Sequence, residues 1–577
     1  MLLGISEKYF KKKKESAFIM RKQTKLVAVL STAALLALGA SMSSFAATGW
    51  QEENGTWVYY DKNGDKETEK WEKSGDNWFY LNEDGEMATD VIVEFNDNYY
   101  YVDENGSMVA NKWVSIENED YDGDSDEEPA NHWYYFGSNG KAYKASSNST
   151  TPTFKTVNGK KYIFDDEGKM LYGWVNKEGE RVTGDSAWKS DEGGLYYLGD
   201  ENDGAQTIGW KSIDIVDDEY ENAGNIPGYS SNNVFDDENQ TRWFYFQSNG
   251  KKIVSKDGKG INGKKYSFDA DGRMNAEWVI FDATPDVASQ GIATYSSSFK
   301  YFNSVEDGAR VTKGWFKVVP DENLQKGKYD DDSSYWYYAD GDGDIVTSEI
   351  KTINGKKYMF DNYGRMKDGL WFVKTDGKAV SEFLDDDGAL PYDTEDHFKA
   401  SANDLVSGQY RVYYFGDGND GSMKTGKQTV SIDGDSFNFL FNKSGSFKGA
   451  GKTGVDDSKY YLAGMLLKAD KDDKYAVIKV DSSDAKAPTS YTLLTTDEFL
   501  ADAFELGVRT NDTTKLDSGD YTEYYNINYT AAKAKGVEYK LVNTSGAVQK
   551  GKSKAKDGND TCYLQTGENI KSVFVED

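Results

Sequence analysis

Aromatic residues recur at a fixed 21-residue spacing near the start of the chain, and this period restricts the fold more than any other feature. Trp50, Trp71 and Trp113 lie on one 21-residue grid, and Ile92 fills its vacant node. A period of this length is typical of a repeat protein, in which each unit buries its apolar surface against its neighbours. Other columns keep the same register, namely Trp57, Trp78 and Tyr99; Tyr59, Tyr80 and Tyr101; Gly64, Gly85 and Gly106; and Met87 and Met108.

Each unit is expected to form a β-hairpin. The segment 57–60 is aromatic and β-branched, as strands are. Asn63-Gly64 follows it, and this pair accepts the positive φ angles of a tight hairpin turn. We therefore expect the hairpin to turn at Asn63-Gly64. Because a lone two-stranded hairpin is marginal in water, the sequence predicts an all-β solenoid of stacked hairpins.

A longer period follows the regular repeats. His132-Trp133-Tyr134-Tyr135 recurs near Trp243 and Trp336, and the segment 158–162 (NGKKY) recurs at 262–266 and 354–358. We therefore expect regular hairpin repeats over 47–113 and three longer multi-hairpin units over 114–430. The pattern decays beyond this point, and 431–577 is either a set of degenerate repeats or a separate β-rich region.

The first 46 residues have the pattern of a secretory signal peptide. A basic run at 20–25 precedes the apolar stretch 26–38, and small residues lead to Ala46. The apolar stretch is shorter than the ~20 residues that a spanning helix needs. We expect cleavage after Ala46 and secretion, with residues 1–19 an extended or wrongly assigned start before Met20.

The composition excludes several classes of function. The chain has 67 basic and 98 acidic residues, a net charge of −31, which argues against nucleic acid as a partner. Two histidines and one cysteine cannot form a His–Cys zinc cluster or an intramolecular disulfide. No nucleophile motif lies beside His132 or His397, and Cys562 is predicted to be a buried residue. We therefore predict no catalytic residue and no cofactor.

Two segments resemble a known family of repeats. Residues 49–64 (Gly49-Trp50-x6-Trp57-x-Tyr59-Tyr60-x3-Gly64) and residues 78–87 resemble the cell-wall-binding (choline-binding) repeats of Gram-positive surface proteins. Residues 159–174 fit the same pattern, which also includes glucan-binding repeats and toxin C-terminal repeats. The resemblance covers about 48–450 and implies stacked hairpins that hold ligands between them with aromatic side chains.

The resemblance implies a secreted protein that is held noncovalently on the cell wall and binds choline-bearing teichoic acid or another glycan. The alternative is a targeting module of a wall-active enzyme whose activity lies in the C-terminal region. Rings of this kind attract quaternary ammonium groups, but the same rings could form only the core of the solenoid. The ligand-cage candidates are Trp50, Trp57, Trp71, Trp78, Tyr80, Tyr99, Tyr101, Trp113 and Trp133.

Two departures from the family pattern reduce the number of complete cages expected. Lys161, Lys265 and Lys357 stand where the regular repeat has its first hairpin aromatic residue. Insertions also separate aromatic residues that are paired in the regular repeat, at 114–132, 211–242 and 316–335. We therefore expect few complete cages beyond the regular repeats.

The same insertions are acidic, so we predict that they form one negatively charged face for a basic partner or divalent ions. Asn118-x-Asp120-x-Asp122 matches the opening of a calcium loop but lacks the closing Glu. Asp120 and Asp122 are therefore weak calcium candidates. Residues 340–344 (Asp-x-Asp-x-Asp) lack the Gly that follows in such a loop.

Overall fold

The computed structural model describes residues 48–121, 123, 128–146, 150–218, 228–230, 234–235, 237–281, 299–384, 392–418, 420–551 and 554–577. The signal peptide predicted at 1–46 lies outside these residues. The chain divides into two compact units. The first comprises the residues up to Tyr220 with Phe235–Asp257 and Ser267–Met274, and the second comprises Glu221–Val234, Gly258–Tyr266 and Asn275–Asp577.

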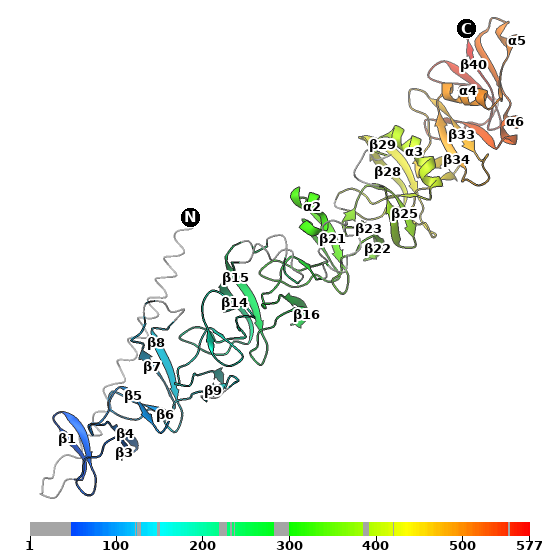
Figure 1. The fold of residues 1–577 in the computed structure, drawn as a ribbon. Helices are drawn as coiled ribbons and strands as arrows, with labels where there is room; N and C mark the ends of the chain where they lie inside the picture. Colours follow the sequence, from blue (N-terminus) through cyan, green and yellow to red (C-terminus); the bar gives the residue numbers. More distant parts are fainter. Residues whose placement is uncertain are drawn as a thin grey trace. The chain divides into compact units, whose positions relative to one another are not determined.

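The first unit is a succession of antiparallel hairpins (Figure 1). They are β1 (Gly49–Glu53) with β2 (Thr56–Tyr60), β3 (Lys70–Ser74) with β4 (Asn77–Leu81), β5 (Val91–Phe95) with β6 (Asn98–Val102), β7 (Lys112–Glu117) with β8 (Asn131–Phe136), β9 (Lys155–Val157) with β10 (Lys160–Tyr162), β11 (Trp174–Val175) with β12 (Arg181–Val182) and β13 (Tyr196–Tyr197), and β14 (Gly209–Val216) with β15 (Asn239–Phe246). The next hairpin, β16 (Lys256–Ile261) with β17 (Lys264–Phe268), has residues in both units.

The second unit continues with hairpins and then with larger sheets. The hairpins are β18 (Trp278–Ile280) with β19 (Phe299–Tyr301) and β20 (Gly314–Val318) with β21 (Tyr335–Ala339). A six-stranded sheet has β22 (Glu349–Ile353), β23 (Lys356–Phe360), β24 (Met366–Lys367), β25 (Leu370–Asp376), β26 (Ala379–Phe383) and β27 (Arg411–Tyr414). A five-stranded sheet has β28 (Gly426–Ile432), β29 (Asp435–Phe441), β30 (Gly454–Asp456), β31 (Lys459–Leu462) and β32 (Met465–Leu466). Helices α2 (Glu322–Asp330) and α3 (Glu395–Ser407) interrupt this series.

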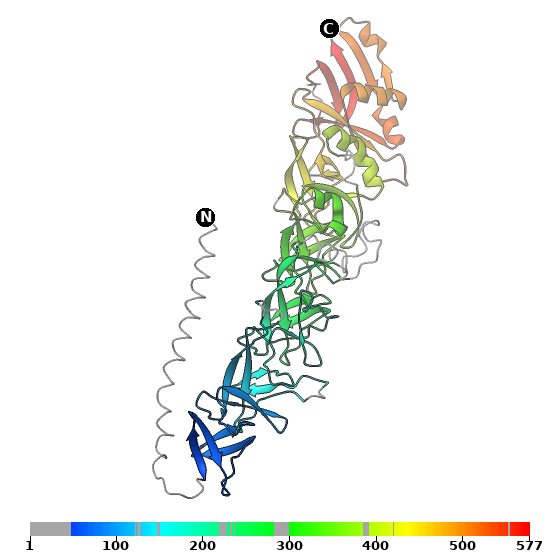
Figure 2. The ribbon, with the colours of Figure 1, turned by 60° about the vertical axis from the view of Figure 1, so that its left-hand side comes forward.

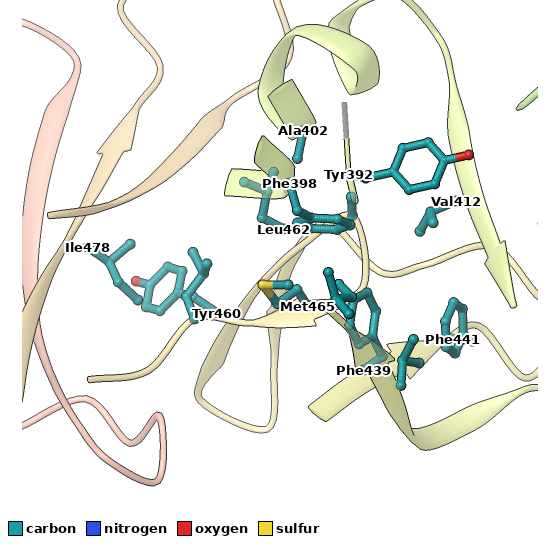
Figure 3. Close-up of a cluster of buried hydrophobic side chains, with 14 of the residues drawn as sticks. Tyr392, Phe398, Ala402, Val412, Phe439, Phe441, Tyr460, Leu462, Met465 and Ile478 are labelled. Carbon is teal, nitrogen blue, oxygen red and sulfur yellow. The ribbon is translucent and has the colours of Figure 1, made fainter. Parts of the chain in front are cut away.

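Helix α3 is an insertion that joins the core of the second unit. Phe398 lies on its inner face, with ring centroids 5.6 Å from those of both Phe372 and Phe439 (Figure 3). The helix begins after Thr394, whose side chain accepts the N–H of His397. The ring of His397 is hydrogen-bonded to Asp393, and this bond lowers the pKa of that carboxyl group. His397 therefore stabilises a helix start.

Residues 475–577 build two sheets of their own (Figure 2). One sheet has the order β34-β33-β37 and the other β35-β36-β40-β39-β38. Phe499 and Ala503 of α4 are fully buried between them, and Cys562 is buried against Phe574, as predicted. The elements are β33 (Tyr475–Asp481), β34 (Ser490–Leu494), α4 (Thr496–Glu505), β35 (Arg509–Asn511), α5 (Thr513–Leu516), β36 (Tyr521–Ile527), α6 (Tyr529–Ala534), β37 (Val537–Asn543), β38 (Ala555–Lys556), β39 (Thr561–Thr566) and β40 (Asn569–Glu576).

The hairpin turn lies earlier in each repeat than the sequence pattern predicted. β1 and β2 are joined at Asn54-Gly55, where φ is 51° and 85°. Two successive positive φ values are those of a type I′ turn, whose twist matches the strands that it joins. The prediction of a turn at Asn63-Gly64 was wrong, because a second Asn-Gly pair closes the hairpin. As a result, Trp50 on β1 pairs directly with Tyr59 on β2.

Asn63-Gly64 belongs instead to the loop that leads to the next hairpin. Asp61 Oδ1 accepts the N–H groups of Asn63 at 2.7 Å and Asp65 at 2.9 Å, an Asx turn that satisfies the loop backbone. The same turn explains the acidic run at 340–344, where Asp340 Oδ1 accepts the N–H groups of residues 342 and 344 at 2.8 and 3.0 Å. That run is therefore a repeat loop.

A recurring backbone hydrogen bond links successive hairpins. An N–H group in the loop that follows one hairpin donates to a carbonyl group of the preceding hairpin. Met87 N–H donates to Trp57 O at 2.7 Å, and Met108 N–H donates to Trp78 O at 2.8 Å. The predicted all-β fold of stacked hairpins is confirmed by the recurrence of this bond. The other donor–acceptor pairs are Ala142–Tyr99, Met170–Trp133, Gln206–Lys161, Lys252–Leu195 and Met274–Trp243 in the first unit, and Arg310–Lys265 and Met423–Lys357 in the second.

No helix among the described residues combines the length and the apolar character that a membrane span requires.

Candidate ligand-binding junctions

The space between one hairpin and the next is called a junction here, and each is named after its first-strand Trp. In the Trp50 junction, Trp50 and Trp57 come from β1 and β2 of one hairpin. The next hairpin supplies Phe79, whose ring centroid lies 5.4 Å from that of Trp50, and Met87, which makes the inter-hairpin hydrogen bond. This arrangement places a ring of the next hairpin against Trp50 and the backbone of Met87 against that of Trp57.

The Trp71 junction repeats the arrangement one hairpin later. The ring centroid of Trp71 lies 5.1 Å from that of Tyr100, and Met108 donates to the carbonyl of Trp78. Trp78 is 41% exposed, so its indole is accessible to a ligand. Burial raises the pKa of Tyr100, which keeps this hydroxyl group protonated. Four residues of the predicted cage set (Trp50, Trp57, Trp71 and Trp78) are therefore brought together in pairs.

The predicted tyrosines are placed differently. Tyr80 packs on Trp71 of its own hairpin, with ring centroids 5.2 Å apart, while Tyr101 pairs across the strands with Ile92. Tyr101 donates a hydrogen bond to Asp90, and burial and this bond raise the pKa of Tyr101. Tyr99 has the Lys144 ammonium 4.9 Å from its ring centroid. The next-hairpin rings in contact with Trp50 and Trp71 are Phe79 and Tyr100, which sequence reasoning did not select.

The Trp113 junction has the same composition despite the insertion in its hairpin. Trp113 lies 4.9 Å from Tyr162 and 5.8 Å from Phe164 between ring centroids. Its pairing with Tyr135 is retained, and Met170 donates to the carbonyl of Trp133. The candidates Trp113 and Trp133 are thus brought together.

The Trp210 junction contains a further pair of tryptophans, which were not among the candidates selected from the sequence. The rings of Trp210 and Trp243 have centroids 6.3 Å apart and are nearly perpendicular, at 88°. Phe268 lies 5.7 Å from Trp210, and Met274 donates to the carbonyl of Trp243. Two indoles at right angles form two walls of a cage.

The Trp315 junction, in the second unit, has the same geometry. Trp315 and Trp336 lie 6.3 Å apart at 90°, and Tyr358 lies 4.8 Å from Trp315. Met366, which pairs with Phe360, occupies the loop position. The expectation of few complete cages stays a prediction, but the extra residues lengthen these two hairpins at the turn and leave the Trp register unchanged.

The paired tryptophans of the described chain are more exposed than most of the unpaired ones. All ten Trp of these five pairs keep part of their surface accessible. By contrast, three of the four unpaired Trp, namely Trp174, Trp188 and Trp278, are only 8, 2 and 1% exposed, while Trp371 keeps part of its surface accessible. Core rings would be expected to be buried as these three are. The paired Trp are therefore poorly explained by a core role alone.

In two of the hairpins with lysine in place of the second Trp, the preceding lysine forms an ion pair with a later repeat. In the NGKKY hairpins, Lys160 lies 3.0 Å from Asp203 and Lys264 lies 2.9 Å from Asp307. In both pairs the acid lies 43 residues after the lysine. These hairpins therefore contribute contacts between repeats, whereas the paired-Trp hairpins contribute the cages.

Charges beside the cages differ from one junction to the next. Glu52 faces Trp57 across the strands of the first hairpin, while Lys73 faces Trp78 in the second. The Lys73 ammonium lies 6.0 Å from the centroid of the Trp78 ring. A cationic ligand would be attracted by Glu52 and repelled by Lys73, so the two junctions should differ in affinity.

Most acidic residues of the insertions are exposed where they are described, namely Asp218, Asp237, Glu238, Asp330, Asp331 and Asp332. Asp217 is buried and forms an ion pair with Arg273, and Asp218 lies 3.3 Å from Lys189. The prediction of an acidic face was therefore wrong for Asp217, because this residue is buried against Arg273.

The calcium hypothesis stays a prediction. Asp120 is exposed, and its N–H donates to Asn118 Oδ1 at 3.2 Å. Asp122 lies outside the described residues. In the part of the chain that the structure describes, no group of three or more His, Cys, Asp or Glu side chains is arranged to hold a metal ion.

The fold and the junctions define a hairpin-repeat protein with paired tryptophans at five junctions between its repeats. Residues 68–113 match the family model of the choline-binding repeat, and residues 130–142 match that of the putative cell wall binding repeat. These two segments therefore carry choline-binding and cell wall binding repeats, as the sequence motifs predicted. Each match includes part of a hairpin that carries paired Trp, and the first also covers the β5–β6 hairpin, which has none.

Curated relatives contain similar sequence. Glucosyltransferase-S of Streptococcus mutans is 26% identical over 398 residues, which is 63% of this chain and 24% of that protein. Glucosyltransferase-I of Streptococcus downei is 27% identical over 288 residues, 49% of this chain and 14% of that protein. The chain thus spans about a quarter or less of the length of these relatives.

Solved structures with partial similarity include choline binding protein F of Streptococcus pneumoniae in the presence of a peptidoglycan analogue. It is 17% identical, with a TM-score of 0.29, over 71% of this chain and 100% of that one. The modular autolysin LytC of the same species, in complex with a synthetic peptidoglycan ligand, is 17% identical with a TM-score of 0.29, over 57% of this chain and 55% of that one.

Proposed function

We propose that this chain is a secreted protein that is held noncovalently on the cell wall through its five paired-Trp junctions. The ligand proposed is the quaternary ammonium group of choline carried by a wall teichoic acid. The partial exposure of all ten paired Trp carries this proposal, because rings needed only for the core would be buried. Each pair is completed by a third ring and a methionine of the next hairpin.

The energetics favour many weak sites on one polymer. A quaternary ammonium gains about 0.5–2 kcal/mol from each aromatic face, depending on desolvation. Three faces therefore give at most ~6 kcal/mol, which is offset by an association cost of ~4 kcal/mol or more. A single junction should then bind only at millimolar concentration. A polymer that engages several junctions would gain about 10²–10⁴-fold from effective concentration.

A glycan is the second candidate ligand, and one observation favours it. The curated relatives are glucosyltransferases, and neutral sugar rings also stack on exposed indoles. Charge favours choline, because Glu52 lies across from Trp57 in the first cage and a carboxylate attracts a cation but not a neutral sugar.

A fluorescence titration separates the two ligands. The mature chain from Ala47 is titrated with choline and, separately, with glucan oligomers. Trp78→Ala should remove one choline site, whereas Tyr99→Ala should not, since Tyr99 occupies the same strand position in a junction without paired Trp. Quenching by glucan but not by tens of millimolar choline would reject choline as the ligand.

We also propose that binding, and not catalysis, is the role of this chain. The alternative of a wall-active enzyme is confined to residues 456–577. Incubating the mature chain with cell-wall polysaccharides and measuring released sugars tests it. Hydrolysis that disappears when residues 456–577 are deleted, with the repeats still able to bind walls, would establish the enzyme alternative.

A further inference from the structure

A lysine replaces methionine at the loop position of the Trp174 junction. All five paired-Trp junctions have Met at this position, but between β13 and β15 it is Lys252. The Lys252 N–H donates to Leu195 O at 2.9 Å, just as Met274 N–H donates to Trp243 O at 2.8 Å one repeat later. Lys252 is only 3% exposed, although lysine is rarely buried unless it is paired.

The buried ammonium of Lys252 lies against the same ring types that line an open junction. Its Nζ is 5.1 Å from the centroid of the Trp174 ring and 5.8 Å from that of Phe244. Both distances are within the range of a cation–π interaction. Nζ also donates a hydrogen bond to the carbonyl of Trp188. Two ring faces and one carbonyl therefore replace part of the water that burial removes.

Trp188 is itself held in place by neighbouring residues, so its carbonyl group is already positioned to accept the hydrogen bond from Lys252. It lies between β12 and β13, and its indole N–H donates to Val216 O at 2.9 Å. The Arg273 guanidinium lies 4.6 Å from the centroid of the Trp188 ring. This ring is 2% exposed. Contacts with Val216 and Arg273 therefore hold Trp188 in position, and the carbonyl of Trp188 in turn binds the Lys252 ammonium.

We propose that Lys252 is a built-in ligand whose ammonium fills the cation position of the Trp174 junction and closes it to external cations. Lys252 is then a specificity-determining residue, because it helps decide which Trp-bearing junctions of the array can bind. The identity of the external ligand rests on the proposed function, but the occupancy by Lys252 does not. An ammonium at this position also supports cation recognition over neutral sugar recognition in the open junctions.

Chemical rescue tests the proposal directly. Lys252→Ala removes three methylenes and the ammonium, and n-propylammonium supplies the same atoms. We expect the variant to lose about 4 °C or more in its thermal midpoint and to recover at least half of that loss with saturable propylammonium binding. The neutral n-propanol should not restore it. The matched control is Met274→Ala, which empties the same loop position in the open Trp210 junction; compared with the unmodified chain at the same propylammonium concentration, its loss should not be restored.

A folded Lys252→Ala variant that propylammonium does not restore would overturn the proposal, and so would equal restoration of Met274→Ala. If Lys252→Ala does not fold, acetylation of the unmodified chain is followed by mass spectrometry. Lys252 should react at least ten times more slowly than the exposed Lys211, and choline should not change its rate. Faster acetylation of Lys252 with choline would overturn the proposal, because it would mean that choline displaces the ammonium. Failure of choline to bind at Trp78 in the titration above would reject the proposed function and leave the rescue result intact.

Discussion

The Trp174 and Trp210 junctions both lie in the first unit and share the same inter-hairpin backbone hydrogen bond, but the two side chains at that bond differ. Both start from a Trp on the first strand that pairs with a Tyr on the second. Leu195 and Lys252 stand in the first junction where Trp243 and Met274 stand in the second. The Trp174 ring is 8% exposed, whereas Trp210 and Trp243 remain accessible.

This comparison shows that the same kind of hairpin junction occurs in two forms, one filled by a side chain of the protein and one left accessible. The inter-hairpin hydrogen bond needs only backbone groups, so it holds the repeat together whatever the side chains are. The side chains at two positions then determine whether a junction is filled from within or left open. Stacking and ligand binding are thus separable in this array, as expected of repeats stabilised by nearest-neighbour contacts.

The largest expected effect comes from removing the second-strand Trp from every open junction. Replacing Trp57, Trp78, Trp133, Trp243 and Trp336 with Ala should weaken retention on isolated cell walls by 100-fold or more, because multivalent binding is lost. Sedimentation with walls measures it. The control is Trp188→Phe, which changes a buried Trp outside the open junctions and should retain wall binding. Equal losses in both variants would contradict the division into open and filled junctions.

A second prediction uses the turn glycines to disturb an open junction indirectly. Gly106 has φ 76°, and an added Cβ would meet the side chain of Met87 at 2.8 Å. Gly106→Ala should therefore cost about 1–2 kcal/mol from the left-handed backbone and also displace the methionine of the Trp50 junction. Choline affinity at that junction should fall as well, as measured by titration.

The matched control for Gly106→Ala is Gly55→Ala. Gly55 has φ 85°, but an added Cβ there meets nothing within 4 Å. It should show a similar loss of stability by thermal unfolding with little change in choline affinity. An equal loss of affinity in both variants would show that Met87 has no part in the cage.

A third prediction concerns pH and the filled junction. Burial lowers the pKa of Lys252 to about 8, from 10.5. The cost of burying the ammonium is therefore fully present below pH 8 and is relieved as pH rises toward 10.5, where the unfolded chain still binds the proton. The charged groups around Lys252 are Asp271, Asp269, Arg273 and Asp191.

Lys252→Met should remove this pH dependence. Measured by denaturant unfolding, the stability of the unmodified chain relative to Lys252→Met should rise between pH 8 and pH 10.5, by at most about 3 kcal/mol. A flat difference across this range would contradict a buried ammonium at neutral pH.

The smallest expected effect comes from the charges beside the cages. Glu52→Gln should weaken choline binding at the Trp50 junction two- to three-fold, and Lys73→Met should strengthen it at the Trp71 junction by a similar factor, since exposed charge pairs contribute about 0.2–1 kcal/mol. Titration at low and high salt measures both effects, which salt should reduce. Opposite signs would point to an anionic ligand.

The sequence predicted the fold because the aromatic columns and turn glycines occur in every repeat. It misplaced the hairpin turn because Asn54-Gly55 and Asn63-Gly64 are equally good turn sequences, and only strand pairing distinguishes them. It selected Trp50, Trp57, Trp71, Trp78, Trp113 and Trp133 from their spacing.

The sequence reasoning missed two cages for a physical reason. Insertions separate Trp210 from Trp243 and Trp315 from Trp336, and spacing alone does not show that the hairpin lengthens at its turn. A signal was present, since the methionine two residues after the turn glycine recurs at Met274 and Met366. The burial of Lys252 had no sequence signal, because it depends on a carbonyl of Trp188 that lies 64 residues away.

A crystal structure of the mature chain with saturating choline tests the central claim most directly. The account predicts choline against the paired Trp of the open junctions, with its ammonium between the two indoles. It also predicts that the Trp174 junction holds the Lys252 ammonium and no choline. Choline bound at Trp174 with Lys252 displaced, or paired-Trp junctions that stay empty while other surfaces bind choline, would contradict the account.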